Sequence, residues 1–182
     1  MDKIKDLEVR RLFQEYQYLL TDIEYKDELI SKHKSDFLKD SQIEQENNNP
    51  VSQQNQEKKE KDIIEVDEET KSNIKKIYRD IVKLTHPDKV DSEYLNKLYI
   101  EATDSVRVND VYTLYKICIE LNISFEIGEG EKKAISNGIS ILKKKAEAIE
   151  NSYIWTWINS KTEEEKRDIS NRFKEHCRIN LK

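Results

Sequence analysis

Turn-forming residues are scarce in this chain, which has three Gly and two Pro among 182 residues. A β-sandwich or β-barrel needs a turn signal about every 8 to 12 residues, so this scarcity argues against an all-β fold. Hydrophobic residues are also few, at 36%, whereas 38% of the residues are charged. Because an average globular domain is about 45–50% apolar, the core should be small or interrupted. The composition predicts an all-α protein, built as one unit with an appendage or as two small units.

Cysteines and long apolar runs are scarce too. Cys118 and Cys177 are the two cysteines; they cannot form a disulfide framework, and they lack the C-x-x-C spacing of a zinc or redox site. We expect two reduced thiols. No run approaches the roughly 18 apolar residues of a membrane-spanning helix, and the charged sequence MDKIKDLEVRR at the start lacks the apolar region of a signal peptide. These absences predict a soluble, cytoplasmic protein with no membrane partner.

Patterns typical of catalysis are missing as well. With three Gly and three His, the chain offers no phosphate-binding glycine loop, no nucleophile paired with a base and no cluster of metal ligands. We therefore expect no enzymatic activity, no cofactor and no metal. The net charge of −5 argues against nucleic-acid binding, because a protein that coats phosphates is usually basic. Aromatic residues that could stack on bases are not interleaved with the basic ones.

Composition and periodicity divide the chain into four regions. Residues 1–40 predict an amphipathic, coiled-coil-like helix, and residues 41–65 a polar linker with too little apolar area to offset the entropy of ordering. Residues 66–125 predict a group of shorter helices. Residues 126–182 predict a helical extension at the carboxyl end.

Two apolar stripes with alternating spacings of four and three mark the long helices. The stripe in residues 1–38 is interrupted by Asp27 and Lys34, and a second stripe covers residues 131–153. The two stripes could pair within one molecule or between two copies in a homo-oligomer. Their members are Val9, Phe13, Tyr16, Leu20, Ile23, Ile30 and Phe37 in the first stripe, and Ile135, Ile139, Leu142, Ala146, Ile149 and Tyr153 in the second.

Residues 70–85 predict a helix with one apolar face and one basic face. Between Lys71 and Lys89 there are six basic and two acidic residues, which gives a local charge of +4 in a chain with a net charge of −5. This contrast makes the basic face a candidate docking surface for an acidic partner, although a solvated lysine face has the same pattern. The apolar face holds Ile74, Ile77, Ile81 and Leu84 with Tyr78 at its edge, and the basic face holds Lys75, Lys76, Arg79 and Lys83.

The helix should end abruptly at His86, because Pro87 lacks an amide hydrogen and excludes the preceding residue from the α region. A rigid, exposed His-Pro-Asp turn at residues 86–88 follows. A second amphipathic helix is predicted from about Glu93 to Arg107, with Ser92 or Asp91 as its cap, and a third after Asn109 or Asp110. The loop between the first two is so short that they must pack antiparallel.

This succession of a basic-faced helix, a His-Pro-Asp tripeptide and an antiparallel partner helix resembles the J-domain of DnaJ-type co-chaperones. The stretch IKKIYRDIVKLTHPDK carries the resemblance. The resemblance implies a J-domain-like helical hairpin and one partner, a DnaK-type seventy-kilodalton heat-shock chaperone whose ATP hydrolysis would be stimulated. It also implies a partner-binding set that consists of His86, Pro87, Asp88, Lys75, Lys76, Tyr78, Arg79, Lys83 and Lys89.

The chain also departs from the family pattern. The family's first short helix is not visible before Thr70, so the hairpin lacks support on one side unless residues 1–38 cover it. Asp80 stands where the family usually has a basic residue. The alternative is therefore a degenerate J-like scaffold that oligomerises through its long helices and does not stimulate ATP hydrolysis. The pattern Asn109-Asp110-Val111-Tyr112-Thr113-Leu114, together with a later Trp-x-Trp, resembles the divergent J-like proteins encoded by large DNA viruses. The abundance of Lys, Ile and Asn, which is expected of an AT-rich genome, fits such a source and would place the chain in a host cytoplasm.

The last region carries two further patterns. Trp155 and Trp157 are expected to be core or helix-docking residues, with an exposed peptide-binding patch as the alternative. Thr162 and Glu165 have the spacing of a capping box, which predicts the start of a final helix.

Overall fold

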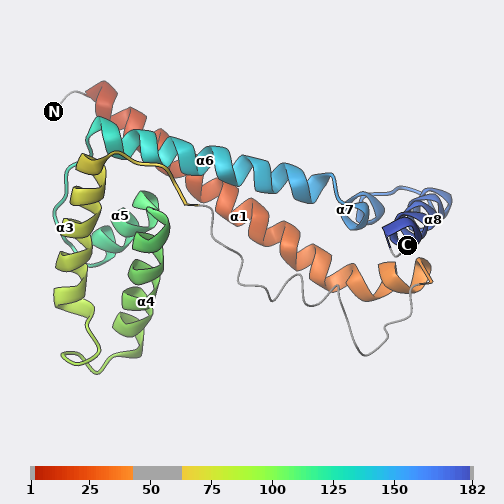
Figure 1. The fold of residues 1–182 in the computed structure, drawn as a ribbon, viewed down its shortest axis with the longest axis horizontal. Helices are drawn as coiled ribbons and strands as arrows, with labels where there is room; N and C mark the ends of the chain where they lie inside the picture. Colours follow the sequence, from red (N-terminus) through yellow and green to blue (C-terminus); the bar gives the residue numbers. More distant parts are fainter. Residues whose placement is uncertain (1–2, 43–62, 181–182) are drawn as a thin grey trace. The chain divides into compact units, whose positions relative to one another are not determined.

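The computed structural model describes residues 3–42 and 63–180, and the fold over these residues is all-α, as predicted. No strand occurs in these two ranges. The predicted linker at 41–65 lies mostly outside them. The helices are α1 (Lys3–Asp40), α3 (Glu68–Thr85), α4 (Glu93–Val108), α5 (Val111–Glu120), α6 (Glu129–Glu150), α7 (Tyr153–Ile158) and α8 (Glu163–Asn180) (Figure 1).

The chain forms two compact units that differ from the four predicted regions. The first unit combines Met1–Leu19 with Lys61–Leu142, and the second combines Leu20–Glu60 with Lys143–Lys182. Both α1 and α6 contribute residues to each unit. Composition could not reveal this division, because a unit assembled from distant segments leaves no mark at any one position of the chain.

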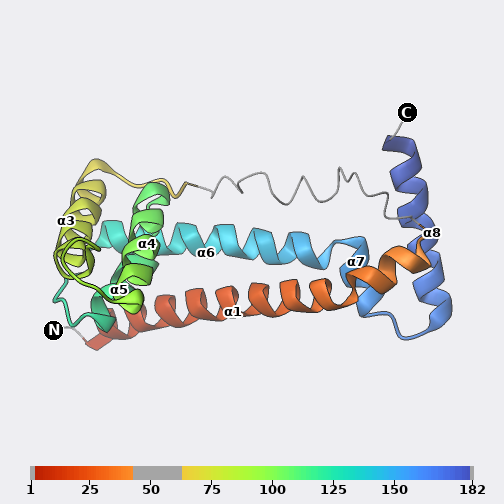
Figure 2. The same ribbon diagram turned by 90° about the horizontal axis from the view of Figure 1, so that it is seen from below.

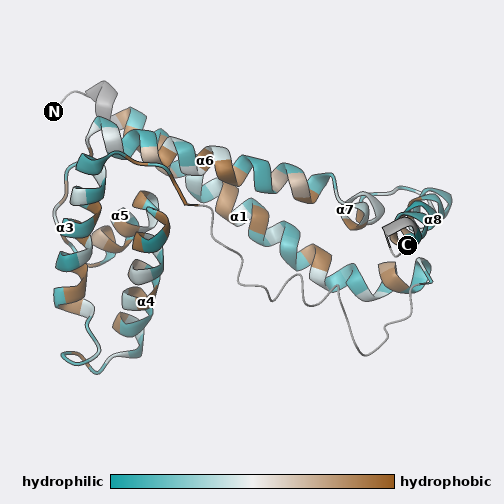
Figure 3. Cartoon of the chain, in the orientation of Figure 1, coloured by the Kyte–Doolittle hydropathy of each residue, from teal (hydrophilic) through white to brown (hydrophobic). Residues whose placement is uncertain are grey.

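Helices α3, α4 and α5 form the centre of the first unit. Figure 1 shows α3 and α4 as an antiparallel hairpin, which confirms the direction expected from the short loop. Helix α5 packs against both and is the most apolar of the three (Figure 3), with seven of its ten residues buried. The least exposed side chains of this core include Ile81, Val111, Leu114, Tyr115, Ile117, Cys118 and Ile135.

Side-chain caps begin these helices; Ser92 is one of the two caps predicted for α4, whereas the sequence analysis named no cap for α3. Asp67 accepts a hydrogen bond from the Thr70 amide at 2.8 Å, and the Ser92 hydroxyl accepts one from the Leu95 amide at 3.4 Å. Such caps satisfy amides that have no partner within the helix. Between α4 and α5, Asn109 ends one helix in the left-handed region with a φ of 57°.

Helices α1 and α6 pair in parallel, within one chain. The starts of α1 and α6 lie side by side in the first unit (Figure 2). There Lys132 Nζ donates to Glu8 Oε2 at 2.7 Å, and Gly138 adjoins the ring of Tyr16. In the second unit, Lys26 Nζ donates to Glu150 Oε1 at 2.5 Å. The apolar stripes predicted to pair within one molecule or between two copies thus face each other inside one chain.

The seam of α1 differs in detail from the predicted stripe. Leu12 and Leu19 are buried, whereas Leu20 is exposed, and the polar residue inside the seam is Lys26 instead of Asp27 or Lys34. Lys26 is 5% exposed, and its Nζ atom also donates to Asp22 at 2.6 Å. The long stem of a lysine can follow an apolar surface and still reach carboxylates, so Lys26 can occupy a position in the seam. Tyr16 and Phe37 of the predicted stripe are buried, as expected.

The second unit has its own small core. Phe37 of α1, Trp157 of α7 and Ile169 of α8 are its buried members, and four partly buried residues pack around them, namely Tyr153, Ile154, Ile158 and Phe173. Trp157 is therefore a core residue, as expected. The capping box is also present, since Glu165 Oε2 accepts from the Lys161 and Thr162 amides at 2.8 and 3.3 Å.

Candidate partner-docking site

The inner face of α3 fastens this helix to the rest of the first unit. Thr70, Ile74, Ile81 and Thr85 are buried along it. The prediction that Leu84 belongs to this face was wrong, because Leu84 is 47% exposed and Thr85 takes the inner position. A threonine can replace an aliphatic residue there because its hydroxyl donates to the Ile81 carbonyl oxygen at 2.9 Å.

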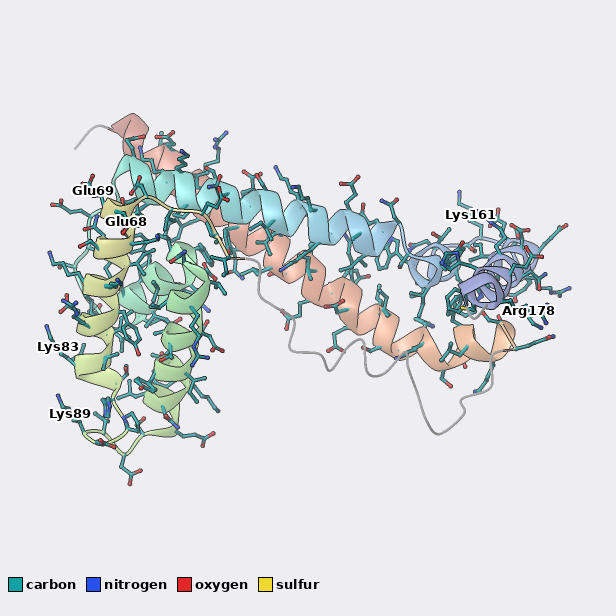
Figure 4. All side chains as sticks on the ribbon, in the orientation of Figure 1. Glu68, Glu69, Lys83, Lys89, Lys161 and Arg178 are labelled. Carbon is teal, nitrogen blue, oxygen red and sulfur yellow. The ribbon has the colours of Figure 1, made fainter. Side chains whose placement is uncertain are left out.

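The outer face of α3 is basic and exposed. Figure 4 shows Lys83 near the end of the helix and Lys89 in the following loop, both on the side of α3 away from α4, whereas Glu68 and Glu69 lie at its start. The acidic first turn and basic last turn both suit the helix dipole. The predicted basic residues Lys75, Lys76, Arg79, Lys83 and Lys89 are all exposed to solvent.

One acidic side chain interrupts this face. Asp80 accepts a hydrogen bond from Lys83 Nζ at 2.6 Å, and this bond lowers the pKa of the Asp80 carboxyl below its usual range. The charge of Lys83 is therefore partly neutralised by an ion pair within its own helix. Among the described residues no carboxylate forms an ion pair with Lys75, Lys76 or Arg79, so these three cations remain open to an external partner.

The tripeptide that follows α3 forms an exposed turn. His86 ends the helix in an extended conformation with φ −61° and ψ 127°, as expected for a residue before proline. The Lys89 amide donates to the His86 carbonyl oxygen at 2.9 Å and closes the turn. Pro87 and Asp88 are exposed, and the Asp88 side chain retains 86% of its free accessibility.

The two remaining residues of the predicted partner-binding set, His86 and Tyr78, contact residues of α4. The His86 ring packs edge-on against the ring of Tyr99, which leaves the imidazole side chain 33% exposed. The Tyr78 hydroxyl lies 3.1 Å from Thr103 Oγ1. Because Thr103 donates its own hydroxyl hydrogen to the Tyr99 carbonyl oxygen at 2.8 Å, Tyr78 is the donor in that pair. Tyr78 thus offers only part of its ring to a partner.

Helix α1 supports the hairpin on the side that the sequence left open. The ring of Tyr16 stacks on Tyr112 with centroids 4.2 Å apart, and its hydroxyl donates to Asp110 Oδ1 at 3.2 Å. Burial, followed by the nearby Asp110 carboxylate, raises the pKa of Tyr16 far above its usual value. Tyr112 in turn donates to Gln17 Oε1 at 2.5 Å. Residues of α1 therefore cover α5, and α5 supports both α3 and α4.

Helix α6 and the segment before α3 complete the support. Asn73 Nδ2 of α3 donates to the buried carboxylate of Glu131 at 2.8 Å. The Ile64 amide donates to the Val108 carbonyl oxygen at 2.9 Å, and Ile64 is buried, although composition assigned it to the polar linker. No sequence signal pointed to Asn73 and Glu131, because residues 58 positions apart share no periodicity.

Two further kinds of reactive group in the described residues are cysteine thiols and possible metal ligands. Burial raises the pKa of the Cys118 thiol to about 11, so the thiol is protonated at neutral pH and unreactive. Over residues 3–42 and 63–180, no group of three or more His, Cys, Asp or Glu side chains is arranged to hold a metal ion. None of the helices in the same ranges is long and apolar enough to cross a membrane.

Comparisons of the chain with protein-family models, with curated proteins and with solved structures gave no match.

Proposed function

We propose that this protein is a J-domain-type co-chaperone, which docks on a DnaK-type seventy-kilodalton heat-shock chaperone and stimulates its ATP hydrolysis. One observation carries the proposal. The His86–Asp88 turn protrudes from the tip of an antiparallel hairpin, directly after a helix whose outer face exposes Lys75, Lys76 and Arg79. A rigid polar turn and an adjoining cationic face form a two-part docking surface.

The charge of the outer face supports an acidic partner. Three unpaired cations on one helix face attract a negatively charged surface, and such complementarity mainly raises the association rate and fixes the register of docking. We expect binding to weaken as salt rises, because exposed charges are screened over about 8 Å at physiological ionic strength. Stimulation needs no catalytic group in this chain, because docking can favour the hydrolysis-competent conformation of the chaperone.

The alternative function is that of a J-like scaffold without stimulation. The ion pair between Asp80 and Lys83 favours it, since it removes one cation from the docking face. The scaffold alternative also relied on oligomerisation through the long helices. The burial of the apolar seams of α1 and α6 within one chain gives this alternative less support. We therefore favour the co-chaperone.

The decisive experiment is a single-turnover ATPase assay of a purified DnaK-type chaperone with the full-length protein. We expect the wild type to accelerate hydrolysis and His86→Gln to abolish the acceleration. A triple variant, with Lys75, Lys76 and Arg79 all changed to Gln, should need a higher protein concentration for the same rate. The matched control changes Lys143, Lys144 and Lys145 to Gln, which removes the same charge from an exposed part of α6.

The first comparison separates the co-chaperone from the scaffold, and the second tests the role of the basic face of α3. Equal rates with the wild type and with His86→Gln would support the scaffold. An equal loss in the docking-face triple variant and in the α6 control would show that overall charge, not the face of α3, determines the effect.

A further inference from the structure

We infer that Tyr99 of α4 is a positioning residue, which fixes the orientation of the His86 imidazole at the tip of the hairpin. Its consequence for a partner rests on the proposed function, whereas the contact itself belongs to the fold. Tyr99 belongs to the amphipathic pattern of its helix, which would otherwise mark it as an ordinary packing residue.

Two restraints act on the His86 ring. The ring centroids of His86 and Tyr99 lie 5.5 Å apart with an angle of 68° between the planes, which is an edge-to-face arrangement. The Asp88 amide donates to His86 Nδ1 at 3.2 Å. An aromatic contact and a hydrogen bond through Nδ1 together leave the imidazole one orientation, although it lies at the surface.

The same contacts determine which ring nitrogen faces a partner. Because Nδ1 accepts a hydrogen bond, the neutral ring carries its hydrogen on Nε2. The His86 side chain is 33% exposed, and among the described residues no hydrogen bond uses its Nε2 atom. Nε2 is therefore a preset donor for an acceptor oxygen on the docking partner. An unrestrained histidine would have to lose rotamer freedom on binding, which weakens an interaction.

Helix α4 acts on a second residue of the site in the same way. Thr103 lies one turn after Tyr99 and accepts the hydrogen bond from the Tyr78 hydroxyl. The Thr103 hydroxyl is itself directed by its bond to the Tyr99 carbonyl oxygen. Helix α4 contributes no residue to the predicted partner-binding set, yet it holds both His86 and Tyr78.

The test compares Tyr99→Leu with Tyr99→Phe in the full-length protein. Phenylalanine keeps the edge-to-face contact, so Tyr99→Phe should stimulate the chaperone like the wild type. Leucine removes the contact, so the concentration needed for half-maximal stimulation should rise about two- to tenfold, as expected for one aromatic pair. The matched control is Tyr94→Leu, which changes a tyrosine that is 55% exposed on the same helix and contacts Glu120 instead of His86.

Nuclear magnetic resonance separates this inference from the proposed function. The wild type should show nuclear Overhauser effects between the His86 and Tyr99 rings, and only Tyr99→Leu should shift the His86 ring carbons and the Asp88 amide. These spectra support the inference even if the chaperone assay fails for every protein. The absence of the ring-to-ring effects in the wild type would overturn it, as would a Tyr99→Leu variant that stimulates like the wild type or a Tyr94→Leu variant with an equal loss.

Discussion

Removal of the Tyr16 hydroxyl tests whether α1 covers the hairpin as described. Tyr16 is 4% exposed, stacks on Tyr112 and donates to the Asp110 carboxylate at 3.2 Å. Tyr16→Phe keeps the stacked ring and loses the hydrogen bond to an ionised acceptor. At pH 7 this should lower the free energy of unfolding by about 2 kcal/mol.

The cost of this substitution should depend on pH in a defined direction. The pKa of Tyr16 is raised in the folded protein by burial and by Asp110. The contribution of Tyr16 to stability is therefore complete below the unfolded-state pKa of about 10, and it is lost as the pH rises toward the folded-state value. At pH 11 ionisation of the unfolded wild type should remove about 1 kcal/mol, so the difference between wild type and Tyr16→Phe should shrink to about half of its value at pH 7.

Urea denaturation followed by circular dichroism at pH 7 and pH 11 measures both differences. Ionisable groups that do not contact Tyr16 contribute equally to both proteins, so their effects cancel in the difference. The control is Tyr18→Phe on the same helix, because Tyr18 is 67% exposed. If the Tyr16→Phe difference stays constant with pH, or if Tyr18→Phe shows the same narrowing, then Tyr16 is not buried against α5 and the described support of the hairpin is wrong.

Three further substitutions, at two positions, test the pairing of α1 with α6. Gly138→Ala should lower the free energy of unfolding by about 1–3 kcal/mol, as measured by urea denaturation, although alanine has the better helix propensity. The new methyl group would lie 2.7 Å from a ring carbon of buried Tyr16. A stabilised variant would contradict this contact. Lys26→Met should change stability by less than about 1 kcal/mol, since methionine keeps the stem and Glu150 remains 53% exposed. Lys26→Ala should cost about 2 kcal/mol, and equal losses in both variants would show that charge dominates.

Local signals predicted most of the hairpin. The proline after His86 determines where α3 ends, and the caps at Ser92 and Asp110 lie where side-chain oxygens precede an apolar period. Such features depend on residues within one turn of each other, so the sequence contains them. The exposed basic side of α3 follows from the same periodicity.

These local signals could not predict contacts between segments that lie far apart in the sequence. The alternating spacing of α1 and α6 indicated that each has an apolar seam, but not that they run parallel or that Lys26 lies inside the seam. The assignment of Leu84 to the inner face failed because Thr85 can satisfy its hydroxyl within the helix. Tyr99 could be recognised as a helix-face residue but not as a neighbour of His86, because the two residues belong to different elements and share no periodicity.

In the proposed function, the basic face of α3 and the turn at residues 86–88 would have different roles in binding. The cations on α3 would attract and align an acidic partner, and the restrained turn would make the short-range polar contacts that depend on geometry. A loss of charge should then affect association, whereas a change in the turn should affect the response of the partner after docking.

The most direct test of the docking surface is a chemical-shift map of the isotope-labelled protein on addition of an ATP-bound DnaK-type chaperone. We expect the amide signals of α3 from Lys75 to Lys83, and those of residues 86–89, to shift or broaden first. The signals of α7 and α8 should remain unchanged at the same ratio. Changes confined to α7 and α8, or no change at saturating chaperone, would contradict the account.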